Sequence, residues 1–131
     1  MGKSADFVTG IYQAFGRGDV PAVLGAFDPA IIWREAEGFL LADRNPYQGP
    51  QAVAEGVFQR LMTIVDDFTA IPESMVDGGD TVVAQGRYRG KMKATGTLVD
   101  AQFAHVWHLR DGKIARFQQY TDTRQWAAAA G

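Results

Sequence analysis

The spacing of apolar side chains in the first 35 residues predicts two helices followed by a strand. Residues 4–16 place apolar side chains every three to four positions on one face, which is typical of an amphipathic helix. Asp19 and Pro21 are typical of a helix start, and they predict a second helix that ends at residues 28–29. Residues 30–35 then change to an alternating pattern, which predicts a short strand.

The middle of the chain predicts a loop and a third helix. Residues 36–49 contain Gly and Pro, which favour a loop, but also several apolar side chains that a fully solvated loop would not need. We therefore expect this loop to pack over the interior. Pro50 opens a helical pattern that ends near residues 66–67, and Gly56 within it costs up to about 1 kcal/mol relative to Ala.

The second half of the chain alternates as strands do. Glycine-containing turns separate four predicted strands at residues 68–76, 81–89, 98–110 and 113–122. Asp111-Gly112 is the sharpest signal, because a type I′ hairpin needs positive φ at both central positions. Residues 126–131 carry little information, and we expect them to be mobile or helical.

This order of elements predicts an α+β fold in a single domain that spans residues 1–131. Three N-terminal helices should pack on one face of a strongly curved, mostly antiparallel sheet. Such an arrangement is a cone-shaped α+β barrel, and the space between its layers is suited to a small molecule.

Composition narrows the classes of function. Hydrophobic residues make up 47% and charged residues 21%, which is enough apolar surface for a folded core. A net charge of −2 gives no general attraction to nucleic acid or anionic lipid, so we expect neither partner. The absence of cysteine excludes thiolate metal sites and thiol nucleophiles. With no signal-peptide pattern and no apolar run long enough to span a bilayer, we expect a cytoplasmic protein.

The two histidines, His105 and His108, do not predict a metal site. Residues three apart on a strand point to opposite faces, so these side chains cannot bind one metal together. His105 shares its face with Phe103 and Trp107 and should point inward. It is either a hydrogen-bonded core residue or a catalytic group.

The last predicted strand carries an unusual row of polar side chains. If no bulge intervenes, Arg116, Tyr120 and Asp122 share one face with Ile114 and Gln118. That face either lines the interior, where each polar group needs a partner or a ligand, or meets solvent or another subunit.

Glu35 is a second candidate carboxylate, because it shares a face with Trp33 on the first predicted strand. In an apolar pocket its pKa would differ from that of a second acid in a different environment. This difference allows one group to accept a proton while the other donates one. The alternative is a salt bridge with Arg34 or Arg116. Tyr12 and Tyr88 can each direct a hydroxyl inward. The apolar pocket lining that we expect is Trp33, Phe58, Phe103, Trp107 and Tyr120.

Three stretches carry a family resemblance: residues 11–15 (IYQAF), residues 47–53 (YQGPQAV) and residues 110–114 (RDGKI) leading to residues 120–122 (YTD). From about residue 7 to residue 122 the chain resembles the nuclear transport factor two-like superfamily, and within it the SnoaL-like polyketide cyclases and ketosteroid isomerases. This scaffold also supports binding domains without catalysis.

The resemblance implies roles for particular residues. Asp122 is similar to the general acid/base of SnoaL-like cyclases, and His105 lies near the hydrogen-bond donor of ketosteroid isomerases. Their proton-shuttling carboxylate lies near Arg34 and Glu35, without a clean match, and Tyr12 lies near their oxyanion-binding tyrosine. The resemblance thus implies a cofactor-free cyclase, isomerase or lyase acting on a small hydrophobic carbonyl compound. Whether or not the protein is catalytic, we expect a homodimer formed through the sheet face, because that face is otherwise left uncovered. The alternative is a noncatalytic ligand-binding or dimeric interaction domain of the same fold.

Overall fold

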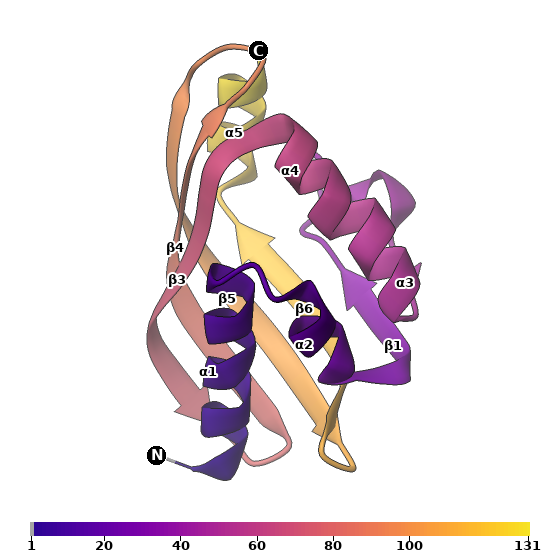
Figure 1. Cartoon of the computed structure of the whole chain (residues 1–131). Coiled ribbons are helices and arrows are strands. Elements are labelled where there is room, and N and C mark those ends of the chain that lie inside the picture. Colours follow the sequence, from indigo (N-terminus) through magenta and orange to yellow (C-terminus); the bar gives the residue numbers. More distant parts are fainter. Residues whose placement is uncertain (1) are drawn as a thin grey trace.

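Six strands form one curved sheet, and the helices pack mainly against its concave face (Figure 1). The structure is a computed structural model that describes residues 2–131. Its helical elements are α1 (Lys3–Gly16), α2 (Val20–Gly25), η1 (Ala42–Arg44), α3 (Pro50–Val53), η2 (Ala54–Gln59), α4 (Arg60–Ile64) and α5 (Thr123–Ala130). Its strands are β1 (Phe27–Arg34), β2 (Tyr47–Gln48), β3 (Val65–Asp77), β4 (Thr81–Met92), β5 (Leu98–Arg110) and β6 (Lys113–Thr121).

The sheet has the strand order β2-β1-β6-β5-β4-β3, in which only the β1–β6 pair is parallel. The predicted α+β class, with helices on a mostly antiparallel curved sheet, is confirmed. The sheet does not close into a complete barrel, because β2 and β3 remain its two edges. The elements α3, η2 and α4 follow one another without a break and act as the predicted third helix.

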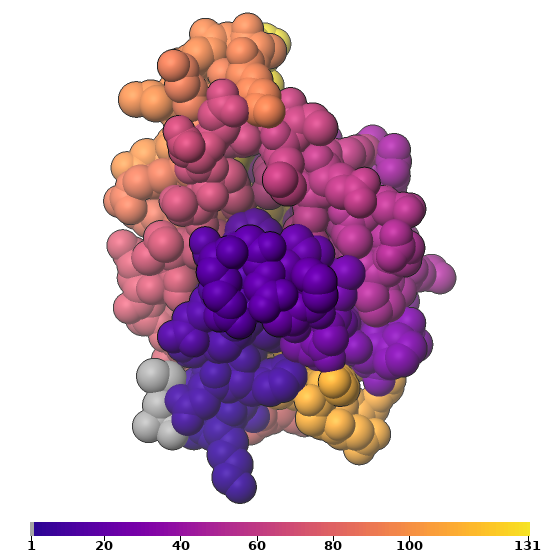
Figure 2. Space-filling model, in the orientation of Figure 1, coloured from indigo at the N-terminus to yellow at the C-terminus, as the bar shows by residue number. Residues whose placement is uncertain are grey.

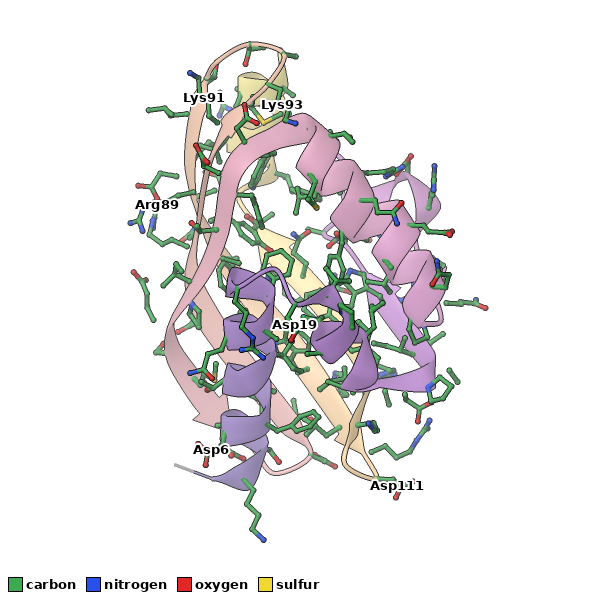
Figure 3. The ribbon with its side chains drawn as sticks, in the orientation of Figure 1. Asp6, Asp19, Arg89, Lys91, Lys93 and Asp111 are labelled. Carbon is green, nitrogen blue, oxygen red and sulfur yellow. The ribbon has the colours of Figure 1, made fainter. Side chains whose placement is uncertain are left out.

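The helices and the sheet enclose an apolar core, while the charged side chains labelled in Figure 3 point outward. The labelled side chains in that view, all on the surface, are Asp6, Asp19, Arg89, Lys91, Lys93 and Asp111. No helix within residues 2–131 is both long and apolar enough to cross a membrane.

The hairpin between β5 and β6 forms as the sequence predicts. Asp111 has φ of 53° and Gly112 has φ of 74°, so both lie in the left-handed region. Asp19 caps α2 as expected, and its side chain accepts a hydrogen bond from the backbone N–H of Ala22. However, α2 ends at Gly25, because Phe27 already pairs with Ile114 of β6. Residues 28–29 therefore lie within β1 rather than ending the helix.

The C-terminal segment forms a helix, which is one of the two alternatives expected for residues 126–131. Trp126 of α5 is fully buried and packs edge-on against Phe39, with ring centroids 5.3 Å apart. Its ring also meets Tyr88 at 5.8 Å. The helix α5 therefore closes one end of the space between the layers (Figure 1).

Gly56 is required by a close approach rather than by backbone flexibility. A Cβ at this position would lie 2.4 Å from Cε2 of Tyr47. The ring of Tyr47 is buried and its hydroxyl donates a hydrogen bond to the carbonyl oxygen of Leu41, so it has little freedom to move. The glycine thus lets the third helix lie directly against β2.

We expect Gly56→Ala to destabilise the protein by about 1–3 kcal/mol, because the added methyl group overpacks the contact with Tyr47. Gly10→Ala is the matched control, since no heavy atom lies within 4 Å of a Cβ there. That change should stabilise α1 by about 0.5–1 kcal/mol. Urea unfolding measures both, and equal stabilisation by the two substitutions would contradict the packing argument.

Candidate functional site

An internal cavity of about 60 Å³ lies between the sheet and the helices α1, η2 and α4. This volume has space for a few water molecules or part of a small organic molecule. Its apolar lining is Ile11, Phe15, Val23, Trp33, Phe39, Val57, Phe58, Leu61, Phe68, Ala70, Trp107 and Phe117. Its polar lining is Tyr12, Glu35, Tyr88, His105 and Gln119. A mostly apolar cavity with a few convergent polar groups is typical of a small-molecule site.

Four apolar side chains separate the cavity from a groove on the surface. Phe15, Phe58, Leu61 and Phe68 line both spaces. The ring of Phe15 lies 5.5 Å from that of Phe58 and 6.0 Å from that of Phe68. Figure 2 shows the surface hollowed here, above the α1–α2 turn and between β3 and α4. These four side chains, which we call the entrance cluster, lie on one route from the surface to the cavity.

His105 is held between two tyrosines inside the cavity. Its Nδ1 lies 2.6 Å from the hydroxyl oxygen of Tyr12, and its Nε2 is hydrogen-bonded to the hydroxyl of Tyr88. The imidazole comes from β5, and the phenols come from α1 and β4. Three separate elements therefore fix one row of hydrogen bonds.

Each tyrosine hydroxyl also accepts a hydrogen bond from a nitrogen that can only donate. The indole N–H of Trp107 donates to the hydroxyl oxygen of Tyr12 at 3.1 Å. The side-chain amide of Gln119 donates to the hydroxyl oxygen of Tyr88 at 2.9 Å, and its carbonyl oxygen accepts the backbone N–H of Ala36 at 3.0 Å. The second contact fixes the orientation of the Gln119 amide, because only its oxygen can accept that N–H.

Burial keeps this row of groups neutral. Burial lowers the pKa of His105 from 6.5 to about 3, so the imidazole is uncharged at neutral pH. Burial also raises the pKa of Tyr12, against the opposing effect of the Trp107 hydrogen bond. It likewise raises the pKa of Tyr88 well above 10, and the negative charge of Glu35 adds to that shift. At neutral pH these groups donate and accept hydrogen bonds without carrying charge.

Glu35 is the ionisable group without a partner in this cavity. Only 3% of the residue is exposed, and its carboxyl makes no hydrogen bond to another group within residues 2–131. Burial raises its pKa from 4.5 to about 8, while the nearby indole of Trp33 and the charge of Arg60 oppose the shift. The Trp33 N–H itself lies outside hydrogen-bonding geometry. A carboxyl of this kind titrates close to neutral pH, as a general acid or base requires.

Comparison with known proteins identifies the family. Residues 8–117 match the model of the SnoaL-like domain, which covers most of the chain. The chain belongs to the SnoaL-like family. No curated protein matches the chain. An NTF2-like protein from Burkholderia thailandensis has a very similar solved structure, with 36% identity, 100% of this chain and 99% of that chain covered, and a TM-score of 0.94.

Two more distant structures share the SnoaL-like fold. TerC, crystallised with polyporic acid, is 23% identical, with 96% of both chains covered and a TM-score of 0.85. IdmH from Streptomyces antibioticus, described as a candidate polyketide cyclase, is 21% identical, with 98% of both chains covered and a TM-score of 0.82. At these identities the likeness establishes the fold.

The structure brings together most of the site residues predicted for this SnoaL-like chain. Those that line the cavity are Tyr12, Trp33, Glu35, Phe58, Tyr88, His105 and Trp107. Phe103 is buried but does not line the cavity. Its ring stacks on the imidazole of His105 with centroids 4.1 Å apart, and so supports the imidazole from behind.

Arg116 and Tyr120 lie on the opposite face of the sheet from the cavity, which corrects their expected position. Tyr120 is 56% exposed, and both residues line a groove on the outer face. The reason is a bulge in the β5–β6 pair: Leu109 pairs with Ile114, but His108 pairs with Arg116. One extra residue in β6 reverses the face of every later side chain.

Asp122 also lies outside the cavity. Its carboxylate accepts a hydrogen bond from the backbone N–H of Gln125 at 3.1 Å and caps the N-terminus of α5. The expected pair of Asp122 with His105 in one pocket does not form, and Glu35 is the carboxyl that shares the cavity with His105.

Gln119 is a site residue that sequence reasoning missed. It faces the cavity because it pairs with His105 across the sheet. The Asp111-Gly112 turn predicts that strand pairing approximately, but the bulge shifts the partner of His105 from Gln118 to Gln119.

Proposed function

We propose that this SnoaL-like protein is a cofactor-free acid/base enzyme that moves a proton at a carbon next to the carbonyl group of a small apolar molecule. The observation that carries this proposal is the unpartnered, buried carboxyl of Glu35 in the same cavity as two hydrogen-bonded tyrosine hydroxyls. The carboxylate of Glu35 supplies the base, and a tyrosine hydroxyl supplies the hydrogen-bond donor for the carbonyl oxygen of the substrate.

The proposed step begins with the ionised carboxylate of Glu35. It takes a proton from the carbon next to the carbonyl group, and the electron pair of that C–H bond moves toward the carbonyl oxygen. A hydroxyl hydrogen from Tyr12 or Tyr88 stabilises the developing enolate oxygen. Return of the proton to another carbon gives an isomerisation, whereas attack of the enolate on a second carbonyl group gives a ring closure. Carbon–carbon cleavage through the same enolate gives a lyase reaction.

The apolar walls support this choice of chemistry. Trp33, Phe58 and Trp107 line the cavity together with Glu35, and desolvation by burial is the main cause of the raised pKa of its carboxyl. Other members of the fold support the substrate class, because TerC was crystallised with polyporic acid and IdmH is described as a candidate polyketide cyclase.

The test is deuterium exchange into cyclohexanone in heavy water, followed by NMR, with no need to know the natural substrate. Because Glu35 acts as a base only when ionised, the exchange rate should rise with pH, reach half its maximum near pH 8 and level off above about pH 9. Protein-dependent exchange with that profile supports the proposal. A rate that is flat between about pH 6 and pH 9 would contradict the role of Glu35.

A noncatalytic ligand-binding domain is the second candidate, favoured by the small volume of the cavity and its mostly apolar lining. Mass spectrometry of small molecules that copurify with the protein distinguishes the two. A tightly held molecule that the protein leaves unchanged, with no exchange of ketone protons, would favour binding.

We also infer that two copies of the chain pair through the outer face of the sheet. Tyr120 is exposed there, and Ile32 and Val106 line the same groove without being fully buried. One uncovered face of this kind is typical of a sheet that is covered by a second subunit. Sedimentation equilibrium measures the mass and so decides between monomer and dimer.

A further inference from the structure

The row of hydrogen bonds through His105 contains one more hydrogen than it can use. Neutral imidazole carries one N–H, and Tyr12 and Tyr88 carry one O–H each, which makes three hydrogens. The two contacts of the imidazole with the tyrosines need only two of them. Trp107 and Gln119 cannot take the third, because both already donate to the tyrosine oxygens.

Two arrangements satisfy every contact. In the first, Tyr12 donates to Nδ1 of His105, Nε2–H donates to Tyr88, and the hydroxyl hydrogen of Tyr88 is left free. In the second, Tyr88 donates to Nε2, Nδ1–H donates to Tyr12, and the hydroxyl hydrogen of Tyr12 is left free. The tautomer of the imidazole therefore decides which tyrosine can donate into the cavity.

Glu35 distinguishes the two arrangements because it lies on the Tyr88 side. Gln119 joins the backbone N–H of Ala36, the residue directly after Glu35, to the hydroxyl of Tyr88. The charge of Glu35 also acts on the pKa of Tyr88. The titratable groups that line the cavity are Tyr12, Glu35, Tyr88 and His105, and the charge of Arg60 reaches Glu35 from α4.

We propose that His105 is a tautomeric selector: when Glu35 is ionised, the imidazole carries its hydrogen on Nε2 and Tyr88 presents its hydroxyl hydrogen to the cavity. In that arrangement the N–H and O–H groups of the row all donate in the direction from Trp107 to Tyr88, so their dipoles have the positive end on the side of Glu35, which is favourable for a negative carboxylate. His105 then acts as a positioning residue and not as an acid or base.

This selection defines the ligand, in a step that rests on the proposed function. The cavity then offers one free hydroxyl hydrogen and one carboxylate, both in its lining. It therefore suits a neutral molecule with a carbonyl oxygen for Tyr88 and an acidic C–H for Glu35. A carboxylate ligand is disfavoured, because a second negative charge would lie beside Glu35 in an apolar cavity.

The test is NMR of the ligand-free protein with ¹⁵N-labelled histidine, which distinguishes Nε2–H from Nδ1–H imidazole. His108→Gln assigns the two sets of signals, since the chain has two histidines. At about pH 9.5, where Glu35 is ionised, His105 should be Nε2–H, and the tautomer ratio should change about tenfold or more between pH 6 and pH 9.5. Nδ1–H imidazole at the higher pH, or doubly protonated imidazole at neutral pH, would overturn the proposal.

Matched variants separate the effect of charge from that of structure. Glu35→Gln keeps the shape but removes the charge, so the tautomer ratio should no longer change with pH. Asp122→Asn removes a carboxylate outside the cavity and keeps a capping side chain, so it should behave as the unaltered protein does. A pH response that survives in Glu35→Gln would overturn the role of Glu35. These measurements use no substrate, so an absence of ketone exchange would refute the proposed function without changing the result for the tautomer.

Discussion

Glu35→Gln is expected to lower the rate of ketone proton exchange by about 10²- to 10⁴-fold, the usual contribution of a general base. The amide has the size of the carboxylate but cannot accept a proton at neutral pH. The carboxyl makes no hydrogen bond within residues 2–131, so its replacement breaks no hydrogen bond between side chains. The measurement is exchange into cyclohexanone at about pH 9, where the native carboxyl is ionised.

Asp122→Asn is the control for this experiment. The resemblance to SnoaL-like cyclases implies that Asp122 is the base, whereas the structure places it at the cap of α5. Asparagine also caps helices well, so the fold and the rate should both be retained. Loss of exchange in Asp122→Asn together with full activity in Glu35→Gln would reverse the assignment.

The second large effect is a maximum of stability between about pH 4.5 and pH 6.5. The folded protein keeps the proton of Glu35 up to about pH 8, but the unfolded chain releases it above 4.5, so stability falls as pH rises between those values. His105 acts oppositely: the unfolded chain binds a proton below 6.5 and the folded protein does so only near 3. Stability from His105 is therefore lost as pH falls through that range. Between about pH 4.5 and pH 6.5 the two opposite effects on the free energy of unfolding cancel.

Urea unfolding at a series of pH values measures this profile. Above pH 6.5 only the Glu35 slope remains, and by pH 8 it should cost on the order of a few kcal/mol. Glu35→Gln should remove this loss and make the protein more stable than the unaltered chain at pH 8, at the expense of activity. A profile that is the same with and without the carboxyl would show that Glu35 is not buried in solution.

Local sequence signals predicted the elements of the fold well, because hairpin and helix signals are short in range. The Asp111-Gly112 turn and the strand at residues 98–110 formed as predicted. The candidate site depended instead on the register beyond the turn. A single extra residue near Ala115 moved Gln119 into the cavity and turned Tyr120 out of it, and no pattern in the sequence marks that bulge.

Contacts between distant elements decided the other differences. The helix α2 ends early because Phe27 pairs with a residue of β6. The helix α5 is held in place because Trp126 packs in the core against Phe39. Glu35 could be named from its position beside Trp33, but its lack of partners follows from the packing of all the layers. Tertiary packing of this kind overrides local preference.

The entrance cluster consists of side chains that belong to helices and a strand, not to a mobile loop. We therefore expect a ligand to pass Phe15 and Phe68 by changes of side-chain rotamer, which are much faster than the opening of a backbone segment. Molecules thin enough to pass between flipping rings could come and go without any rearrangement of the fold. Residence time would then be set by the width of the ligand more than by its total surface.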